Sequence, residues 1–351
     1  MSVWDTYPDH YRSQEILMIL KAVQAGECVS LVGLSGAGKS NLLGFMAHRV
    51  MQGPRFCLVD CNDLPAANAA SLFSAMIESM GEDPLIQADA RLIIRVVEKH
   101  LRESSTGICF LFDRFDLFNG TSPEQISLTS NLRALRDHFK YTLTYITATR
   151  TPLQSSSELA ELFSGNICWL GSLSREDALW SISQFAARHG ETWDIVQMEK
   201  IYAITLGYPS MLRAVCEAYL TGVPLDVDAL RSTPAVLRRV EEFWADTPRK
   251  DYLQNVGLQN HPLLSAVRPV LPDAAELTAA EQRLLEYFTA HADQVCEKGT
   301  LIQAVWPDEK IAAGLRDDSL TQLVHRLREK VDLGGRKHIE TIPGRGYRYR
   351  Q

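Results

Sequence analysis

Apolar and polar positions along the first half of the chain follow two alternating periods. Largely apolar runs of five to eight residues, the length of a buried strand, are separated by stretches with apolar residues every three or four positions, as on one face of a helix. The predicted strands are 28–32, 55–60, 108–112 and 141–148. The predicted helices are 11–25, 40–51, 92–101 and 125–139. Strands that alternate with helices predict an α/β fold, in which helices cover both faces of a parallel sheet.

The second half of the chain is predicted to be helical up to a proline-rich segment. From residue 173 onward the predicted helices are 174–190, 195–206, 209–221 and 234–246. Prolines then accumulate between residues 248 and 272, which is typical of a connector. A last domain begins near Leu277, where Thr278 and Glu281 form a capping box that opens a helix. The expected parts are an α/β core (1–170), a helical lid (171–248), a connector (249–276) and a small α+β domain (277–351).

A phosphate-binding loop lies between the first predicted strand and the next helix. Its residues match G-x-x-x-x-G-K-[ST] in the strand–loop–helix context that this chemistry requires. Glycines let successive backbone N–H groups turn toward phosphate oxygens, and the helix adds the positive end of its dipole. We expect Lys39 to bridge the β- and γ-phosphates and the Ser40 hydroxyl to ligate Mg²⁺. The predicted ATP- or ADP-binding residues are Gly33, Leu34, Ser35, Gly36, Ala37, Gly38, Lys39, Ser40 and Asn41.

A second element of the same site follows the strand at 108–112. Asp113 ends this apolar run, as the Mg²⁺-holding carboxylate of a Walker B motif does. Many AAA+ ATPases have a glutamate directly after this aspartate to polarise the attacking water, whereas this chain has Arg114. An arginine stays protonated and cannot act as a general base. Asp116 is the alternative candidate for the general base. The arginine at position 114, in place of glutamate, predicts that ATP is bound but hydrolysed slowly.

Two further positions complete the predicted nucleotide site. Arg150 follows the fourth strand, at the carboxyl edge where such folds bind ligands, so it can contact a γ-phosphate; an ordinary surface arginine is the alternative. Pro209, in Gly-Tyr-Pro, opens a predicted helix. Residues 10–220 resemble the STAND branch of the AAA+-like P-loop ATPases, and origin-recognition ATPases share much of the layout. The resemblance implies that the proline region contacts the nucleotide and couples it to the lid.

Charge and composition place the chain among ordinary multidomain proteins. It has 351 residues, 46% of them hydrophobic and 23% charged, and a net charge of −7, which argues against a surface coated in positive charge. No secretory signal and no apolar run long enough to span a membrane is visible, so we predict a cytoplasmic protein. The seven scattered cysteines predict reduced core thiols. The segment 324–351, in contrast, has eight Lys and Arg residues against three Asp and Glu, which indicates an anionic partner.

The last 75 residues carry a second resemblance. Four blocks occur in order: Leu-Thr-x₂-Glu-x₂-Leu-Leu from 277, Leu-Ile-x₂-Val-Trp-Pro from 301, Ser-Leu-x₃-Val-His-Arg-Leu-Arg from 319, and Ile-Glu-Thr-Ile-Pro-Gly-Arg-Gly-Tyr from 339. Together they resemble the winged helix-turn-helix effector domain of OmpR/PhoB-type transcription regulators. That family has a four-stranded sheet before its first helix, and the proline-broken segment 250–276 is expected to supply only a reduced version.

The resemblance predicts a DNA-reading helix and a wing. On the helix 318–332, one apolar stripe is expected to pack while the opposite face enters a major groove. Gln322 can pair with adenine and Arg326 with guanine, whereas Arg328 and Lys330 suit phosphates. Tyr347 is expected to pack in the core. The predicted DNA-binding residues are Ser319, Thr321, Gln322, His325, Arg326, Arg328, Lys330, Arg345 and Arg348.

These features together predict an ATP- and Mg²⁺-dependent regulator that binds double-stranded DNA. RNA polymerase and, in the nucleotide-bound state, a second copy of the chain are further candidate partners. Two other classes fit the same order of domains. One is a replication-initiation or transposition ATPase that remodels DNA, and the other is a signalling ATPase whose winged helix binds protein. Promoter occupancy with low ATP turnover is the outcome that the regulator predicts.

Overall fold

The computed structural model describes residues 2–83, 88–103, 106–119, 123–153, 159–245, 250–264, 277–306, 317–331, 338–342 and 345–350. The chain forms two compact units, Met1–Ser265 and Ala266–Gln351, which are described separately below. The division falls inside the segment predicted to be a connector. None of the helices in the described ranges combines the length and apolar character that a membrane crossing needs. All seven cysteines are free and buried.

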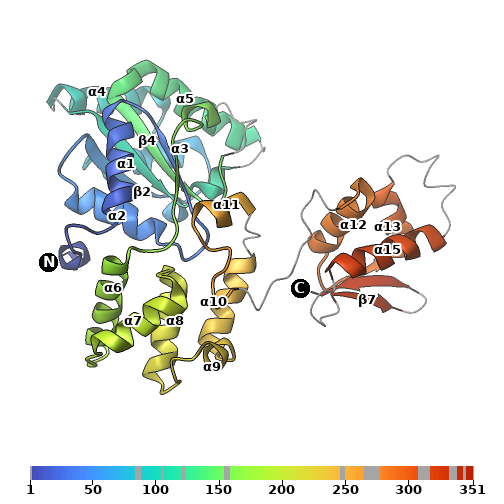
Figure 1. The fold of residues 1–351 in the computed structure, drawn as a ribbon. Coiled ribbons are helices and arrows are strands. Elements are labelled where there is room, and N and C mark those ends of the chain that lie inside the picture. The colour runs from blue at the N-terminus through green and yellow to red at the C-terminus, as the bar shows by residue number, and fades with distance from the viewer. Residues whose placement is uncertain are drawn as a thin grey trace. The chain divides into compact units, whose positions relative to one another are not determined.

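A five-stranded parallel sheet forms the centre of the first unit (Figure 1). Its strands, in the spatial order β2-β3-β4-β1-β5, are β2 (Arg55–Asp60), β3 (Ile108–Asp113), β4 (Leu143–Thr149), β1 (Val29–Val32) and β5 (Ile167–Trp169). All four neighbouring pairs are parallel, as the alternating pattern predicted. β5 was missed because three residues are too few to show a period.

The register of the sheet brings several strand ends to one edge. Asp60 of β2 lies beside Asp113 of β3, and Val32 of β1 lies beside Thr149 of β4. Every residue of β3 and β4 is buried, as expected for central strands of a parallel sheet. The segments that follow β1, β3 and β4 therefore all start from the same carboxyl edge.

Helices of the first unit surround this sheet. They are α1 (Ser13–Gln24), α2 (Lys39–Arg49), α3 (Ala69–Ser79), α4 (Ala90–Glu103) and α5 (Pro123–Phe139). One face of the sheet contributes Phe110, Phe112 and Tyr145 to a core that α3, α4 and α5 complete with Leu72, Ile93 and Leu128, among others. The helix α3 had not been predicted from the sequence.

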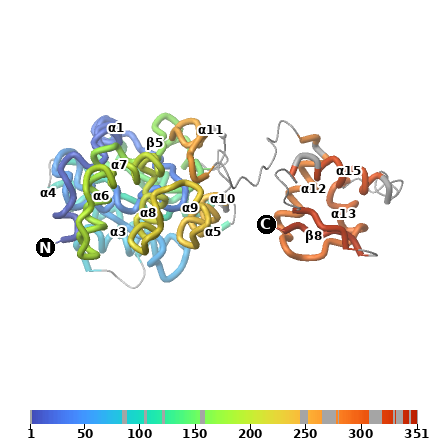
Figure 2. Tube along the Cα trace, turned by 60° about the horizontal axis from the view of Figure 1, so that its bottom comes forward, coloured from blue at the N-terminus to red at the C-terminus, as the bar shows by residue number. Residues whose placement is uncertain are grey.

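A group of helices follows the sheet, visible as the lower part of the first unit in Figure 1 and turned forward in Figure 2. It contains α6 (Arg175–Arg188), α7 (Ile195–Thr205), α8 (Pro209–Leu220), α9 (Val227–Arg231) and α10 (Pro234–Ala245). α8 contacts α6, α7 and α10 and so forms the centre of the group. We call α6–α10 the lid. The short helix α11 (Lys250–Asn255), which like α9 had not been predicted, also belongs to the first unit.

The second unit combines helices with a three-stranded sheet. Its described elements are α12 (Ala279–Ala290), β6 (Val295–Glu297), α13 (Lys298–Val305), α15 (Asp317–Val331), β7 (Ile339–Ile342) and β8 (Gly346–Tyr349). The sheet order is β6-β8-β7, with both pairs antiparallel. The predicted capping box of Thr278 and Glu281 opens α12. The reduced sheet was expected over 250–276. Residues 250–264 instead form α11 and turns that belong to the first unit, and 265–276 lie outside the described residues.

Candidate nucleotide site and DNA-binding surface

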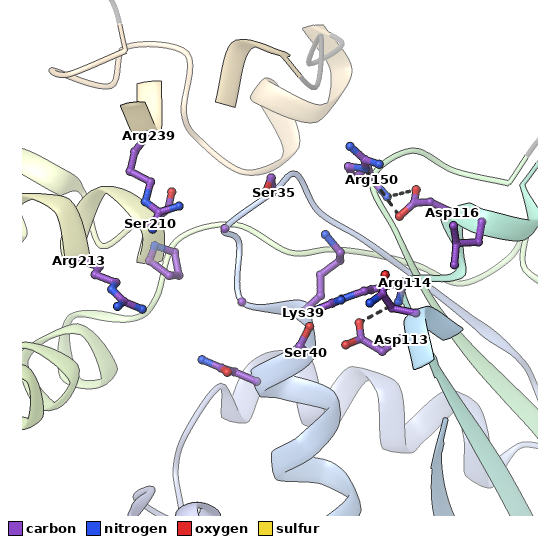
Figure 3. A pocket seen from close by; sticks show the side chains of 16 residues that line it. Ser35, Lys39, Ser40, Asp113, Arg114, Asp116, Arg150, Ser210, Arg213 and Arg239 are labelled. Atoms are coloured by element: carbon purple, nitrogen blue, oxygen red, sulfur yellow. Dashed lines mark hydrogen bonds and ion pairs between the residues drawn. The ribbon is translucent and has the colours of Figure 1, made fainter. Parts of the chain in front are cut away.

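A cavity of about 540 Å³ lies at the carboxyl edge of the parallel sheet (Figure 3). Five cationic and two acidic side chains are among the described residues that line it, so its charge favours an anion. The loop after β1, the ends of β3 and β4, and the lid all contribute. The lining residues are Ser35, Gly36, Gly38, Lys39, Ser40, Asn41, Asn62, Asp113, Arg114, Asp116, Leu117, Arg150, Pro209, Ser210, Arg213 and Arg239.

The glycine-rich loop presents its lysine at the cavity. The Lys39 ammonium group donates to the carbonyl oxygens of Gly33 (2.5 Å) and Leu34 (3.2 Å). Gly33, Leu34 and Ala37 are buried, and their backbone N–H groups donate to Thr149, Tyr252 and Leu34, respectively, so these three predicted residues do not line the cavity. Of the nine residues predicted for this loop, the other six line the cavity.

The donor set for a divalent cation is Ser40 and Asp113. Figure 3 shows both side chains directed toward the same space beside Lys39. Asp113 is 5% exposed, and one of its carboxylate oxygens accepts the backbone N–H of Arg114 at 3.0 Å. A hydroxyl and a carboxylate are hard oxygen ligands of the kind that Mg²⁺ prefers. The residues present therefore fit this cation.

The candidate general base is engaged in another contact. Asp116, in the short 3₁₀ helix Phe115–Phe118, accepts the backbone N–H of Arg150 at 2.8 Å. Its second carboxylate oxygen lies 3.8 Å from Nε of Arg150. Arg114 separates it from Asp113 in a left-handed conformation, with φ of 54°. The contact between Asp116 and Arg150 thus joins the segments that follow β3 and β4. Arg150 lies at the cavity with its side chain about half exposed.

The lid contributes residues that sequence reasoning missed. Ser210, Arg213 and Arg239 line the cavity opposite Lys39 (Figure 3). Arg213 follows the predicted Pro209 by four positions on α8, and residues so spaced share a helix face, so helical spacing could have identified it. Arg239, on α10, and Asn62, after β2, gave no comparable signal because only the tertiary fold brings them here.

The lid touches the loop directly at Gly36. A Cβ atom added to this glycine would lie 2.4 Å from the Cβ of Ser210, and its φ is +77°. Both facts require glycine at this position. The hydroxyl of Tyr208, fully buried, also donates to the carbonyl oxygen of Ser35 at 3.3 Å. Lid and loop therefore share a packed contact rather than an open gap.

A buried arginine, Arg12, forms hydrogen bonds with the phosphate-binding loop and with the segment before the lid. Arg12 is 1% exposed, and its Nη2 donates to the carbonyl oxygens of Ala37 and Gly171, both at 2.9 Å. Its Nη1 pairs with Glu15 at 2.7 Å. Its backbone N–H donates to the buried carboxylate of Asp177 on α6 at 3.0 Å. One residue thus connects the loop, the first helix of the lid and the N-terminal segment, and no local sequence pattern reveals it.

In the second unit, the helix α15 has the two faces that the sequence predicted. Its apolar stripe is buried and packs with α12, α13 and the sheet through Leu320, Leu323, Val324, Leu327 and Val331. The opposite face exposes Thr321, Gln322, His325 and Arg326, with Ser319 half-buried. Tyr347 is 4% exposed, so its predicted place in the core is confirmed.

Several of the predicted DNA contacts also hold the second unit together. Arg328 donates to the carbonyl oxygen of Ile339 (3.1 Å) and to Thr341 (2.7 Å), and its guanidinium lies over the ring of Tyr347. Arg348 forms an ion pair with Glu340 at 2.6 Å. Both arginines therefore connect α15 or β8 to β7. Arg345 is exposed after the wing turn. The side chain of Lys330 and the turn residues 343–344 lie outside the described residues.

The second unit is similar in sequence to a family of known proteins. Residues 273–349 match the family described as "Transcriptional regulatory protein, C terminal". The second unit contains a transcriptional-regulator DNA-binding domain. The two-component response regulator PhoP of Pseudomonas aeruginosa is 40% identical over 115 residues, which are 32% of this chain and 47% of that protein. The response regulator protein GraR of Staphylococcus haemolyticus is 34% identical over 116 residues, 32% of this chain and 48% of that protein. The match therefore spans about half the length of these relatives.

The fold of the chain also has a solved counterpart. The Walker-type ATPase PABY2304 of Pyrococcus abyssi superimposes with a TM-score of 0.50 and 13% identity, covering 96% of this chain and 92% of that one. At this identity the likeness concerns the fold alone. The sequence prediction of a P-loop ATPase fold joined to a winged-helix domain is thus confirmed.

Proposed function

We propose that this chain is a DNA-binding transcription regulator switched by ATP. The observation that carries the proposal is that the loop with Lys39, the carboxylate of Asp113 and the lid residue Pro209 line one cavity, in a chain that ends in a regulator-type DNA-binding domain. ATP or ADP with Mg²⁺ is the proposed ligand. The cationic lining suits a polyphosphate, and the proposed placement of the chain is in the STAND branch of the P-loop ATPases.

The proposed roles follow from the geometry. Lys39 and the loop N–H groups would bind phosphate oxygens, while Ser40 and Asp113 would hold Mg²⁺, which supplies charge neutralisation of the phosphates. Pro209, Ser210 and the lid arginines would contact the nucleotide from the other side. Because these groups belong to two parts of the first unit, a bound triphosphate would favour one position of the lid over others.

Hydrolysis is proposed to be slow. Among the described residues of the cavity, the carboxylates are Asp113 and Asp116. The first is assigned to Mg²⁺, and the second accepts a hydrogen bond from the Arg150 backbone and faces its side chain. Because its carboxylate already faces these partners, fewer of its lone pairs remain to orient an attacking water. Turnover of many ATP molecules per second by the purified protein would contradict this assignment.

The second unit is proposed to bind double-stranded DNA through the exposed face of α15 in a major groove. Gln322 and Arg326 are the proposed base contacts, and Arg345 the proposed contact of the wing. RNA polymerase and a second copy of the chain are proposed partners of the nucleotide-bound form. Two copies would read two half-sites, which is how regulators of this geometry gain specificity.

The decisive experiment measures affinity for a DNA site, selected by the protein from random duplexes, with no nucleotide, with MgADP and with MgATP at fixed salt. We expect affinities that differ by about fivefold or more between nucleotide states. In Lys39→Ala the difference should vanish, because loss of a charge-assisted phosphate contact weakens MgATP binding by about 10- to 100-fold.

The matched control is Lys21→Ala, at an exposed position of α1, which should behave as the wild type does. Equal DNA affinity in all three nucleotide states of the wild type would contradict the switch. Retained nucleotide dependence in Lys39→Ala would instead contradict the assignment of the nucleotide to this loop.

A further inference from the structure

The segment that follows the lid returns to the nucleotide site before the chain enters the second unit. This segment, residues 250–264, is called the strap here and contains α11 and the turns after it. It is held by buried apolar side chains, which are Leu253, Leu258, Leu263 and Leu264. Figure 2 shows α11 beside β5, and the rings of Tyr252 and Trp169 pack edge to face with centroids 6.0 Å apart.

Tyr252 connects the strap to the phosphate-binding loop. Its side chain is 3% exposed. Its hydroxyl donates to the carbonyl oxygen of Leu170 at 2.8 Å and accepts the backbone N–H of Leu34 at 3.3 Å. A buried phenol that bridges two backbone groups is held in position by both. The strap thus contacts the loop through the hydroxyl group of Tyr252.

The peptide group that Tyr252 contacts is also the one that Lys39 contacts. The N–H of Leu34 and the carbonyl of Gly33 belong to the same planar peptide unit. The N–H side faces Tyr252 at 3.3 Å, and the carbonyl side accepts the Lys39 ammonium group at 2.5 Å. A lysine that turns from this carbonyl to a phosphate therefore removes a charge-assisted bond from one side of a peptide whose other side touches the strap.

Two further contacts tie the strap to the lid and to residues 170–174 between β5 and α6, which are called the hinge here. A Cβ atom added to Gly171, between β5 and α6, would lie 2.6 Å from the Cβ of Val256, so the strap packs against bare backbone there. His261, fully buried, donates from Nε2 to the carbonyl oxygen of Thr205 at 2.7 Å. Thr205 ends α7 and is separated from the Gly-Tyr-Pro turn by one residue, Leu206.

We propose that the strap senses which nucleotide occupies the first unit, and that the hydroxyl of Tyr252 is the positioning group that transmits the state of the loop to it. The consequence for DNA binding rests on the proposed function above, because the strap is the last described segment of the first unit before the chain continues to the second. The contacts with the hinge and the lid hold the strap in place, whereas the hydroxyl of Tyr252 is its contact with the phosphate-binding loop.

The test uses the full chain and amide hydrogen exchange of residues 250–264, measured without nucleotide, with MgADP and with MgATP. In the wild type, MgATP is expected to change strap exchange by about fivefold or more. In Tyr252→Phe this response should be lost while MgATP affinity stays within about threefold of the wild type. The matched control is Tyr141→Phe, where the wild-type residue is 75% exposed, and it should keep the full response.

Each outcome is decisive. Unchanged strap exchange in MgATP-saturated wild type, or a full response in Tyr252→Phe, would overturn the inference. So would a loss of MgATP affinity above about tenfold in Tyr252→Phe, because the hydroxyl would then build the loop rather than report on it. A wild-type strap that responds while DNA affinity stays constant would leave this inference standing and reject the proposed DNA switch.

Discussion

The two units present very different surfaces to their proposed polyanionic ligands. In the first unit, the residues around the cavity come from the loop after β1, from the ends of β2, β3 and β4, and from two lid helices. In the second unit, one helix and one hairpin supply every predicted contact, and four of the helix contacts, Thr321, Gln322, His325 and Arg326, are exposed. The first site is thus assembled by the tertiary fold, whereas the second is carried by local structure.

This difference predicts where each unit is vulnerable. A site assembled from distant segments depends on buried groups that no ligand touches, such as Arg12. A site on one exposed helix face tolerates change around it but depends on the identity of each side chain. Three substitutions test this contrast, starting with the one of largest expected effect.

Arg12→Ala should destabilise the first unit by about 3–5 kcal/mol. The change leaves the carbonyl oxygens of Ala37 and Gly171 without their donor and the partly buried Glu15 without its partner. Calorimetry of the full chain should show the transition of the first unit shifted downward and that of the second unit unmoved. The control Arg91→Ala, at an exposed position of α4, should leave both transitions in place. An equal shift of both transitions would refute the independence of the units.

The stability of the first unit should fall as the pH is lowered from 6.5 to 4. Desolvation by burial lowers the pKa of His261 from 6.5 to about 4, against an opposing contribution from the hydrogen bond to Thr205. Because the unfolded chain binds a proton there in this pH window and the folded chain does not, about 3 kcal/mol of stability should be lost on acidification. Stability above pH 6.5 should not depend on this group.

Denaturant titrations of the wild type and of His261→Gln at several pH values provide the measurement. The glutamine variant keeps an N–H donor for Thr205 but does not titrate, so its stability should decline less on acidification. Parallel pH profiles for the two proteins would show that another group is responsible.

Arg326→Ala should weaken binding to the selected DNA site by about 1–3 kcal/mol and relax specificity at one base pair. Its side chain is exposed on α15, so folding should be unaffected. The comparison variant is Arg348→Ala, which removes a side chain already paired with Glu340 and should cost less affinity. Affinities should be measured by titration at fixed salt, with MgATP affinity as a control that neither variant changes. A larger loss of DNA affinity in Arg348→Ala than in Arg326→Ala would reverse the roles that are assigned to these two arginines.

The features that could be predicted from the sequence are those that local structure carries. The loop from Gly33 to Ser40 and the carboxylate of Asp113 could be predicted because they are contiguous motifs at strand ends. The buried stripe of α15 could be predicted because its apolar residues recur at helical spacing. Asn62, Arg239 and the strap could not, since each reaches the first site only through packing between segments far apart in the chain.

Some residues that were predicted for a site from the sequence also have a second role, which only the structure reveals. The sequence indicated that Arg328 and Arg348 are basic residues in a DNA-binding region, yet both are engaged with β7 or its side chains. Similarly, Asp116 was a candidate base by its position, but it contacts the backbone of Arg150 from the neighbouring strand. Periodicity and spacing report which residues share a face, but not which neighbours they meet across a sheet.

The inner strand β3 fixes the position of the residue that ends it. All six of its residues are buried between β2 and β4, so the aspartate at its end is anchored to a strand that is hydrogen-bonded on both sides. Asp113 can thus serve as a fixed reference point for the cation, against which the rest of the site is measured. Any rearrangement that accompanies nucleotide binding or release is then expected in the glycine-rich loop and in the helices that follow it, because the inner strands of the sheet are held by their neighbours.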